Sequence, residues 1–244
     1  MTSRERILLI ISLVLSLLYW SWTYGTYVGS MLVLCILIHE YGHYYWMKRE
    51  GILKRSMVMM PPLGAVAFAK EPWPSRGAES RIALAGPAFG LLSILFPLAV
   101  WLVYGDYESR ISIFFACFLN LFNLLLPIAI LDGGRVIKSI LFSINKNLGF
   151  GFYYYSFGVL FVFTLIFLST LTLIFSILLY MGLSNELNAA RTNPIYIGLK
   201  SMTRREMVMS ALSYLAIVGF FLLVMILNNV YFPDLIKYLS LTRP

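Results

Sequence analysis

The residues best suited to chemistry in this sequence are its two histidines, which both lie in the run His39-Glu40-Tyr41-Gly42-His43. On a helix, positions i and i+4 lie on the same face, so the two imidazoles can bind one metal ion. Glu40 follows the first histidine and can reach a water molecule on that ion rather than the ion itself. This spacing predicts two zinc ligands and a general base, as in metalloproteases.

A third ligand has to come from another part of the chain. A catalytic zinc site normally has three protein ligands and leaves the fourth position to water. Because the sequence has no third histidine, this ligand must be a carboxylate or a thiolate. Asp132, at the end of the apolar run 122–131, is the candidate, and its alternative role is to cap the next helix. Cys35, one turn before His39, is expected to be a small core residue instead.

The composition indicates that these residues lie in a membrane. The chain has 244 residues, of which 60% are hydrophobic and 12% charged, with a mean hydropathy of +0.81. A soluble domain of this size cannot bury so much apolar surface. The net charge of +8 fits basic cytoplasmic loops and does not indicate nucleic-acid binding, because basic residues do not alternate with aromatic ones on a soluble face. The two cysteines, both in apolar segments, predict no disulfide framework.

The apolar segments predict an all-α polytopic membrane protein with six or seven transmembrane helices. The expected spans are at about 7–25, 27–47, 82–104, 111–131 and 207–228. The run 151–183 is too long for one straight span, and as two spans it would turn near Ser169-Thr170. Seven spans place more of the basic residues on one side of the membrane, which mildly favours the hairpin. We expect one transmembrane domain over 1–244, with a catalytic core at 27–140 and C-terminal spans at 151–228.

This topology has two consequences for the site. With a cytoplasmic N-terminus, the histidines lie near the cytoplasmic end of the second span and Asp132 lies at the same end of the fourth, so they can meet. The segment 52–81 is apolar but broken by Pro61, Pro62 and Gly64, which predicts a re-entrant β-like hairpin packed on neighbouring helices. An exposed strand edge within 56–69 could hold an unwound substrate by strand addition.

Together these residues resemble the site-2 protease family of intramembrane metalloproteases. The run from His39 to His43 is similar to the family's first motif, and Asn123 to Pro127 followed by Leu131-Asp-Gly-Gly134 is similar to its second. Ala85-Gly86-Pro87 resembles the motif that opens the third core span, and Met60-Pro-Pro-Leu-Gly64 the loop that enters the membrane. The resemblance covers roughly residues 30–140 and is to a minimal form without PDZ or CBS domains.

The resemblance implies a function and its site. His39, His43 and Asp132 would bind one Zn²⁺ ion, and Glu40 would activate the water. The substrate would be a single-pass transmembrane protein, cleaved within the lipid bilayer of a prokaryotic cell membrane with the active site toward the cytoplasm. Asn120, Asn123 and Gly64 are candidates for substrate binding. Two departures from the family are the three leucines between Asn123 and Pro127 and the glycine at position 90, where an asparagine is often found.

Other functions would use the same ligands differently. A zinc transporter would need ionisable groups along a path through the membrane, and no further span clearly carries charge. A catalytically inactive membrane scaffold would be expected to lose active-site residues, yet all four are present. A prenyl-protein type of membrane metalloprotease would need a downstream glutamate as third ligand, and we expect no glutamate in the later spans. Substrate identity and oligomeric state do not follow from the sequence.

Overall fold

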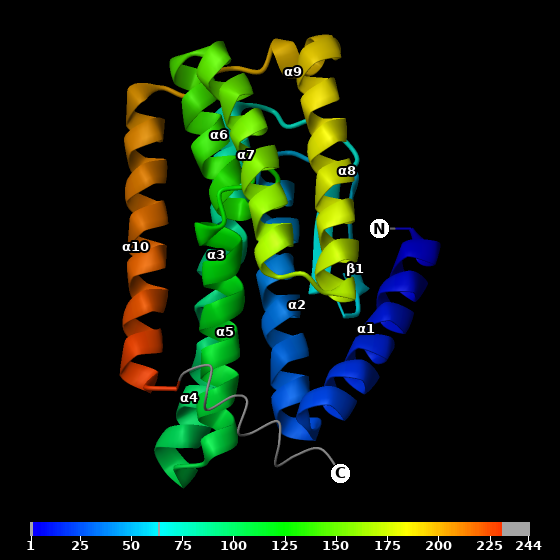
Figure 1. The fold of residues 1–244 in the computed structure, drawn as a ribbon, viewed down its shortest axis with the longest axis vertical. Helices are drawn as coiled ribbons and strands as arrows, with labels where there is room; N and C mark the ends of the chain where they lie inside the picture. The colour runs from blue at the N-terminus through cyan, green and yellow to red at the C-terminus, as the bar shows by residue number, and fades with distance from the viewer. Residues whose placement is uncertain (1, 63, 231–244) are drawn as a thin grey trace.

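The chain folds into a bundle of long helices, with one β-hairpin between the second and third helices (Figure 1). The computed structural model describes residues 2–62 and 64–230. In chain order the elements are α1 (Ser3–Tyr24), α2 (Thr26–Arg49), β1 (Arg55–Met60), β2 (Gly64–Ala69), α3 (Arg76–Gly90), α4 (Leu92–Tyr104), α5 (Tyr107–Leu125), α6 (Asp132–Ile144), α7 (Lys146–Ile166), α8 (Thr170–Thr192), α9 (Pro194–Ile197) and α10 (Arg204–Asn228). The all-α architecture with a hairpin, predicted from the sequence, is confirmed.

The helices are long and apolar enough for a multi-pass membrane protein. Within the described residues, six helical stretches meet this requirement: α1, α3 with α4, α5, α7, α8 and α10. Helix α2 is 24 residues long and lies among them, although it carries the ionisable His39-Glu-Tyr-Gly-His43 run. The apolar run after residue 151 forms two helices, because α7 ends at Ile166 and Ser169 caps the start of α8. The predicted turn near Ser169-Thr170 is therefore confirmed.

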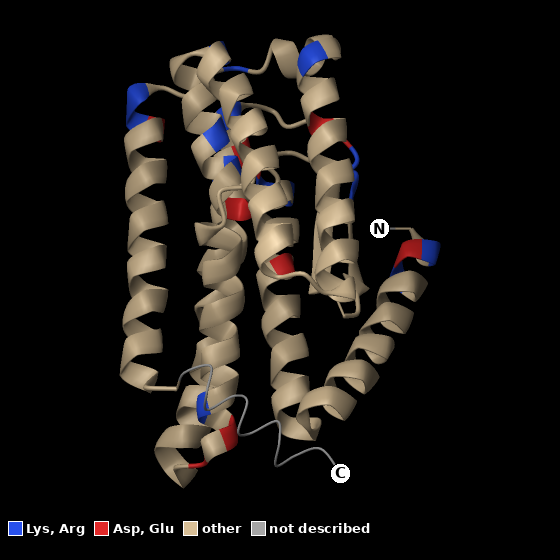
Figure 2. Cartoon of the chain, viewed as in Figure 1, with Lys and Arg blue, Asp and Glu red and all other residues tan. Residues whose placement is uncertain are grey.

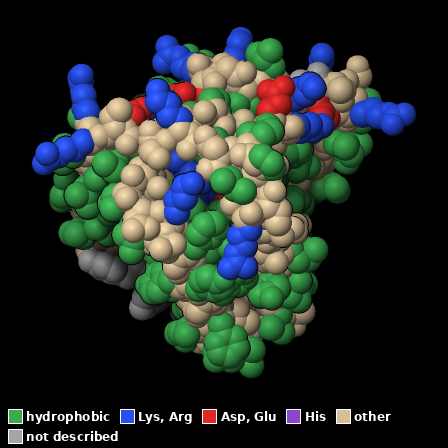
Figure 3. All heavy atoms as spheres, turned by 90° about the horizontal axis from the view of Figure 1, so that it is seen from above, with side chains coloured by type: hydrophobic (Ala, Val, Ile, Leu, Met, Phe, Trp, Pro, Cys, Tyr) green, Lys and Arg blue, Asp and Glu red, His purple; other side chains and the backbone are tan. Residues whose placement is uncertain are grey.

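Charged side chains gather at one end of the bundle. In Figure 2 most Lys and Arg residues lie at the upper end, where α6 ends and α9 and the start of α10 are found. The view onto this end shows basic side chains around its rim (Figure 3). The turn that joins α4 to α5 lies at the opposite end of the bundle (Figure 1), and Arg110 is near the start of α5. This asymmetry agrees with the charge pattern that supports the topology prediction. Lys237 and Arg243, which the seven-span topology places on the other side of the membrane, lie outside the described residues.

The predicted span 111–131 is too long at its C-terminal end. Helix α5 ends at Leu125, and residues 126–131 form an irregular segment before α6 begins at Asp132. Pro127 explains the break, because proline has no N–H and disfavours helical backbone at the residue before it. Leu126 accordingly has an extended conformation. Asp132 is therefore the first residue of a new helix rather than the last residue of a span.

Helix α2 lies at the centre of the contacts that build the site. It packs against α1, α3 and α5, and α3 packs in turn against α6. The hairpin strands pair antiparallel with a register from Arg55 opposite Ala69 to Met60 opposite Gly64. Strand β1 packs on α1, and β2 packs on α2. The β-hairpin predicted within 52–81 is present, and it lies beside the helix that carries both histidines.

Candidate metal centre

Three buried side chains from two helices converge on one point. His39 and His43 lie one turn apart on α2, and their Nε2 atoms are 3.1 Å apart. Asp132, at the start of α6, places Oδ2 3.0 Å from Nε2 of His39 and Oδ1 3.2 Å from Nε2 of His43. Within the described part of the chain, these three residues are the group whose donor atoms could hold a metal ion.

Hydrogen bonds fix the orientation of both imidazoles. The Nδ2 amide of Asn120 donates to the carbonyl of Ala116, so its Oδ1 atom is an acceptor and receives the Nδ1–H of His39 at 2.8 Å. The Nδ1–H of His43 donates to the carbonyl of Ile82 at 2.8 Å. Each histidine therefore carries its proton on Nδ1 and turns the lone pair of Nε2 toward Asp132. This is the usual outer-shell arrangement around a metal-binding histidine.

The donor set fits a metal ion. With both protons on Nδ1, two Nε2 lone pairs and a carboxylate face one another with no proton between them. Oδ2 of Asp132 is buried and has no hydrogen-bond partner among the described residues, although His39 Nε2 is close to it. Acceptor atoms this close repel one another, and a cation between them would remove that repulsion. Zn–N bonds of 2.0–2.1 Å in a tetrahedron separate ligand atoms by about 3.3 Å, near the spacings found here.

The position of Asp132 depends on close backbone packing at the start of α6. A Cβ atom on Gly133 would lie 1.8 Å from the carbonyl oxygen of Leu124, and one on Gly134 would lie 1.9 Å from that of Ile128. Only glycine lets α6 approach the end of α5 this closely. The two glycines after Asp132 therefore set the distance at which its carboxylate meets the histidines.

Glu40 lies beside this group but is held by the hairpin. Its Oε2 atom accepts a hydrogen bond from the backbone N–H of Ala67 at 2.6 Å, and Ala67 is in β2. Glu40 is buried and lies next to both histidine-bearing turns of α2. Its carboxylate is not in the group of potential ligands, which fits a role toward water rather than toward the ion.

Two cavities border the metal centre, and residues of β2 line both of them. The first, of about 310 Å³, is lined by Glu40, His43 and Asp132 and extends toward Trp73 and Tyr196. Burial raises the pKa of the Tyr196 phenol, so this group stays protonated and can donate a hydrogen bond.

The second cavity, of about 450 Å³, is lined by His39 and Glu40 and extends between apolar side chains such as Phe122, Phe175 and Leu179. Its apolar walls match the side chains of a membrane-spanning segment. A chain that follows β2 through both cavities would pass Glu40.

The candidates for substrate binding differ in their surroundings. Asn120 is fully buried with both amide atoms engaged, so its position is that of a support for His39. Asn123 is half-buried, places Nδ2 3.3 Å from Nε2 of His39 and lines both cavities. Gly64, with a φ of 108°, begins β2 and lines the second cavity. Of the two asparagines, Asn123 is therefore the better placed to meet a substrate.

Gly90 accounts for one departure from the family pattern. A Cβ atom at this position would lie 2.2 Å from Oδ1 of Asn120. The space at residue 90 is filled by the side chain that orients His39. The contact between Gly90 and Asn120 could not be predicted from the sequence, because it depends on how α3 packs against α5.

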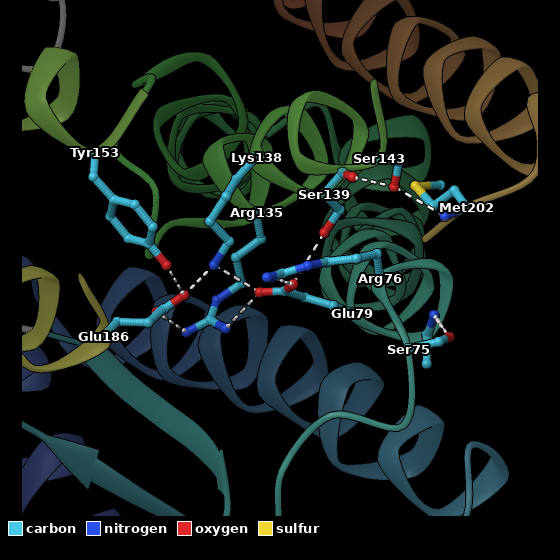
Figure 4. Close-up of polar contacts among 11 residues, drawn as sticks. Ser75, Arg76, Glu79, Arg135, Lys138, Ser139, Ser143, Tyr153, Glu186 and Met202 are labelled. Atoms are coloured by element: carbon cyan, nitrogen blue, oxygen red, sulfur yellow. Dashed lines mark hydrogen bonds and ion pairs between the residues drawn. The ribbon is translucent and has the colours of Figure 1, made fainter. Parts of the chain in front are cut away.

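A buried group of charged side chains adjoins the centre and was missed by sequence reasoning. Figure 4 shows this ion-pair cluster, drawn together by α3, α6 and α8; its members are Arg76, Glu79, Arg135, Lys138 and Glu186. The expectation that no further span carries charge is therefore wrong. Arg135 and Lys138 follow the predicted span 111–131, where the charge pattern predicts a cytoplasmic loop, but Lys138 is fully buried. Because α8 continues to Thr192, a late span also contains a glutamate, Glu186, which pairs with Lys138.

Comparison with known proteins finds relatives among the zinc metalloproteases. The model of peptidase family M50 matches residues 27–108, which include both histidines and Glu40. A curated relative, the zinc metalloprotease MJ0392 of Methanocaldococcus jannaschii, is 26% identical, over an alignment that covers 70% of this chain and 52% of the relative. The family match and the curated relative support the site-2 protease family, peptidase family M50, as the family that this chain resembles.

The chain spans about half the length of the curated relative that it matches. Among solved structures, the site-2 protease from Methanocaldococcus jannaschii aligns with a TM-score of 0.49 and 22% identity, over 75% of this chain and 87% of that chain. The curated relative is a zinc metalloprotease, and the buried group of His39, His43 and Asp132 can hold one metal ion. Zinc, predicted from the sequence, is therefore the cofactor that the site fits.

Proposed function

We propose that this chain is an intramembrane zinc metalloprotease that hydrolyses peptide bonds within the transmembrane segment of a single-pass membrane protein. The observation that carries the proposal is the convergence of two Nε2 atoms and one carboxylate beside Glu40, inside a bundle of membrane-spanning helices. Hydrolysis requires water, and the two cavities next to these residues provide room for it and for a peptide.

Each residue of the centre has a distinct part in the reaction. His39, His43 and Asp132 would hold the zinc ion, which when bound lowers the pKa of a water molecule toward about 7 and polarises the scissile carbonyl. Glu40 accepts the proton of that water and passes it to the leaving amine. Asn123, beside His39 and open to both cavities, is placed to orient the substrate backbone.

Strand β2 provides an edge that can hold an unwound substrate. In an antiparallel pair, the N–H groups along a strand point alternately toward the partner strand and away from it. In this register the N–H groups of Val66 and Phe68 point toward β1, and those of the residues between them point away. Ala67 is one of these, because its N–H donates to Glu40 rather than to a strand partner. Among the described residues, β2 pairs only with β1. A helical substrate must unwind before attack, and an extended segment added to this edge would lie next to Glu40.

The basic end of the bundle supports one orientation in the membrane. Lys and Arg residues accumulate on the cytoplasmic side of membrane proteins, and they gather here at the end toward which the first cavity extends. This distribution supports an active site that opens toward the cytoplasm, and the relative from Methanocaldococcus jannaschii supports a prokaryotic cell membrane.

The function is tested by Glu40→Gln beside Asp132→Ala. The purified proteins are compared for zinc content and for cleavage of a model transmembrane substrate in proteoliposomes, with the new termini identified by mass spectrometry. Glu40→Gln should keep its zinc and lose about 10²–10⁴ in cleavage rate, the usual contribution of a general base. Asp132→Ala should lose both. Zinc uptake into the vesicles that is unaffected by Glu40→Gln, with no cleavage by the wild type, would indicate a transporter instead.

Strand addition is tested with cysteines placed along 56–69. Cysteines at Ala65 and Ala67 in β2 should crosslink to a substrate cysteine near the scissile bond, while cysteines at Ser56 and Val58 in β1 should not. No crosslink from any position of the hairpin would remove this part of the proposal.

A further inference from the structure

Arg135 lies in the ion-pair cluster, but its guanidinium is only loosely paired. Its Nε atom donates to the carbonyl of Ile130 at 3.0 Å. Its terminal nitrogens are 3.7 Å from Oε1 of Glu79 and 3.6 Å from Oε2 of Glu186, which is too far for hydrogen bonds. The buried Nη1 atom has no hydrogen-bond partner within the described part of the chain. The guanidinium therefore keeps donors that the protein does not use.

The two carboxylates near Arg135 are contacted more closely by other groups. Lys138 contacts both, with its Nζ 2.6 Å from Oε1 of Glu79 and in close contact with Oε1 of Glu186. Figure 4 shows that Glu79 also receives hydrogen bonds from Arg76 and Ser139, each at 3.1 Å.

Glu186 in turn receives a hydrogen bond from the hydroxyl of Tyr153 at 3.0 Å. Three cationic side chains thus face two carboxylates in this cluster. The excess positive charge lies on the member with the weakest pairing, Arg135.

Arg135 also faces the space that a substrate would occupy. It lines both cavities, together with Glu40 and Asn123. Its guanidinium lies over the ring of Trp73 with 5.3 Å between Cζ and the ring centroid, which keeps the planar group at the cavity wall. Tyr196 lines the first cavity as well and, as a neutral phenol, can donate a further hydrogen bond.

We propose that Arg135 binds a carboxylate of the substrate and so determines which sequences are cleaved. This inference rests on the proposed protease function. A guanidinium presents parallel N–H donors that match the two oxygens of a carboxylate, and such charge-assisted bonds are stronger in a buried site. The carboxylate is an Asp or Glu side chain beside the scissile bond, or the new α-carboxylate of the N-terminal product. Both place one negative charge where the cluster has one positive charge in excess.

Binding is measured in the zinc-loaded Glu40→Gln protein, so that no result depends on hydrolysis. Fluorescent transmembrane peptides carry Asp or Glu at successive positions of the half that enters the first cavity, and matched peptides carry Asn or Gln. At one position the acidic peptide should bind about tenfold to a hundredfold more tightly than the amide, the range for a hydrogen bond to a charged group. Adding Arg135→Gln should bring this ratio to about one, and Arg135→Lys should retain part of it.

Arg76→Gln is the matched control, because Arg76 also pairs with Glu79 but lines neither of the two cavities. A structural defect in the cluster would weaken the binding of acidic and amide peptides equally, whereas loss of recognition changes their ratio. Arg76→Gln should therefore keep the preference for the acidic peptide.

Glu186→Gln, which removes a carboxylate facing Arg135, should increase the preference for the acidic peptide.

The source of the carboxylate is distinguished with product peptides that end in a free carboxylate or in an amide. A preference for the free carboxylate, lost in Arg135→Gln, assigns the α-carboxylate; a preference seen only in the side-chain series assigns Asp or Glu. The proposal is wrong if neither series shows a preference, or if Arg76→Gln and Arg135→Gln change the ratio alike. Failure of the protease function would instead appear as zinc-loaded wild type that cleaves no substrate.

Discussion

Replacing Gly86 by alanine should weaken zinc binding although it alters no ligand. Gly86 lies on α3, where this helix faces the second histidine of α2. A Cβ atom at this position would lie 2.2 Å from Nε2 of His43 and 2.4 Å from its Cε1 atom. The added methyl group would therefore overlap the atom that binds the metal.

The size of the effect follows from these distances. Ordinary van der Waals contact begins at 3.4 Å, so the His43 ring has to move by about 1.2 Å, whereas metal–ligand distances tolerate about 0.2 Å. The ring cannot simply tilt away, because its Nδ1–H is bonded to the carbonyl of Ile82. Disturbing an outer-shell partner typically costs 10–100-fold in metal affinity. Displacing the ligand itself should cost at least about a hundredfold.

The assay is a zinc titration against a competing chelator, made on purified protein in detergent, with circular dichroism and thermal unfolding of the metal-free forms. Gly158→Ala is the matched control: Gly158 is exposed on α7, and a Cβ atom there meets no atom within 4 Å. Alanine in a helix is favoured over glycine by up to about 1 kcal/mol, so the control should be as stable as the wild type and bind zinc equally. Folded Gly86→Ala protein with wild-type zinc affinity would refute the geometry of the centre.

Two further substitutions test the supports of the site. Asn120→Leu removes the acceptor that orients His39 and should lower zinc affinity by about 10–100-fold; an unchanged affinity in the same titration would show that the hydrogen bond is dispensable. Lys138→Met leaves Glu79 and Glu186 without their nearest cation and should destabilise the protein by about 3–5 kcal/mol, as expected when one partner of a buried ion pair is removed. Denaturant unfolding in mixed micelles measures this loss, and a difference below about 1 kcal/mol would contradict the structural importance of the cluster.

The three candidate metal ligands could be predicted because the sequence carries a signal for each of them. His39 and His43 have helical spacing, and both lie in an apolar span where ionisable groups are costly. Asp132 has no such partner nearby in the sequence, but the charge pattern placed it at the same depth as the histidines. The hairpin was also predictable, since Pro61 and Pro62 interrupt a segment too short to cross the membrane.

The remaining features depend on contacts between segments far apart in the sequence. From hydropathy alone, Lys138 would be assigned to a loop. Hydropathy cannot predict that a lysine is buried when its ion-pair partners lie on other helices. Glu186 was missed for a related reason, since α8 continues beyond the apolar run that defined the span. The role of Asn120 follows only from the 2.8 Å contact with His39, which joins residues 81 positions apart. Pro127, in contrast, is a local signal for the end of a helix, and it predicts an end of α5 close to the observed one.

Glycines determine how closely the helices that carry the ligands can approach. A Cβ atom at Gly42 of α2 would lie 2.5 Å from the carbonyl oxygen of Ala85 in α3, and one at Gly133 of α6 would lie 1.8 Å from that of Leu124 in α5. Small residues serve the packing of membrane helices in general, so these positions have an ordinary explanation. In this protein, however, the same contacts set the separation between α2 and Asp132. The glycines that let these helices pack closely therefore also determine where the candidate ligands lie, although no glycine side chain can bind the metal.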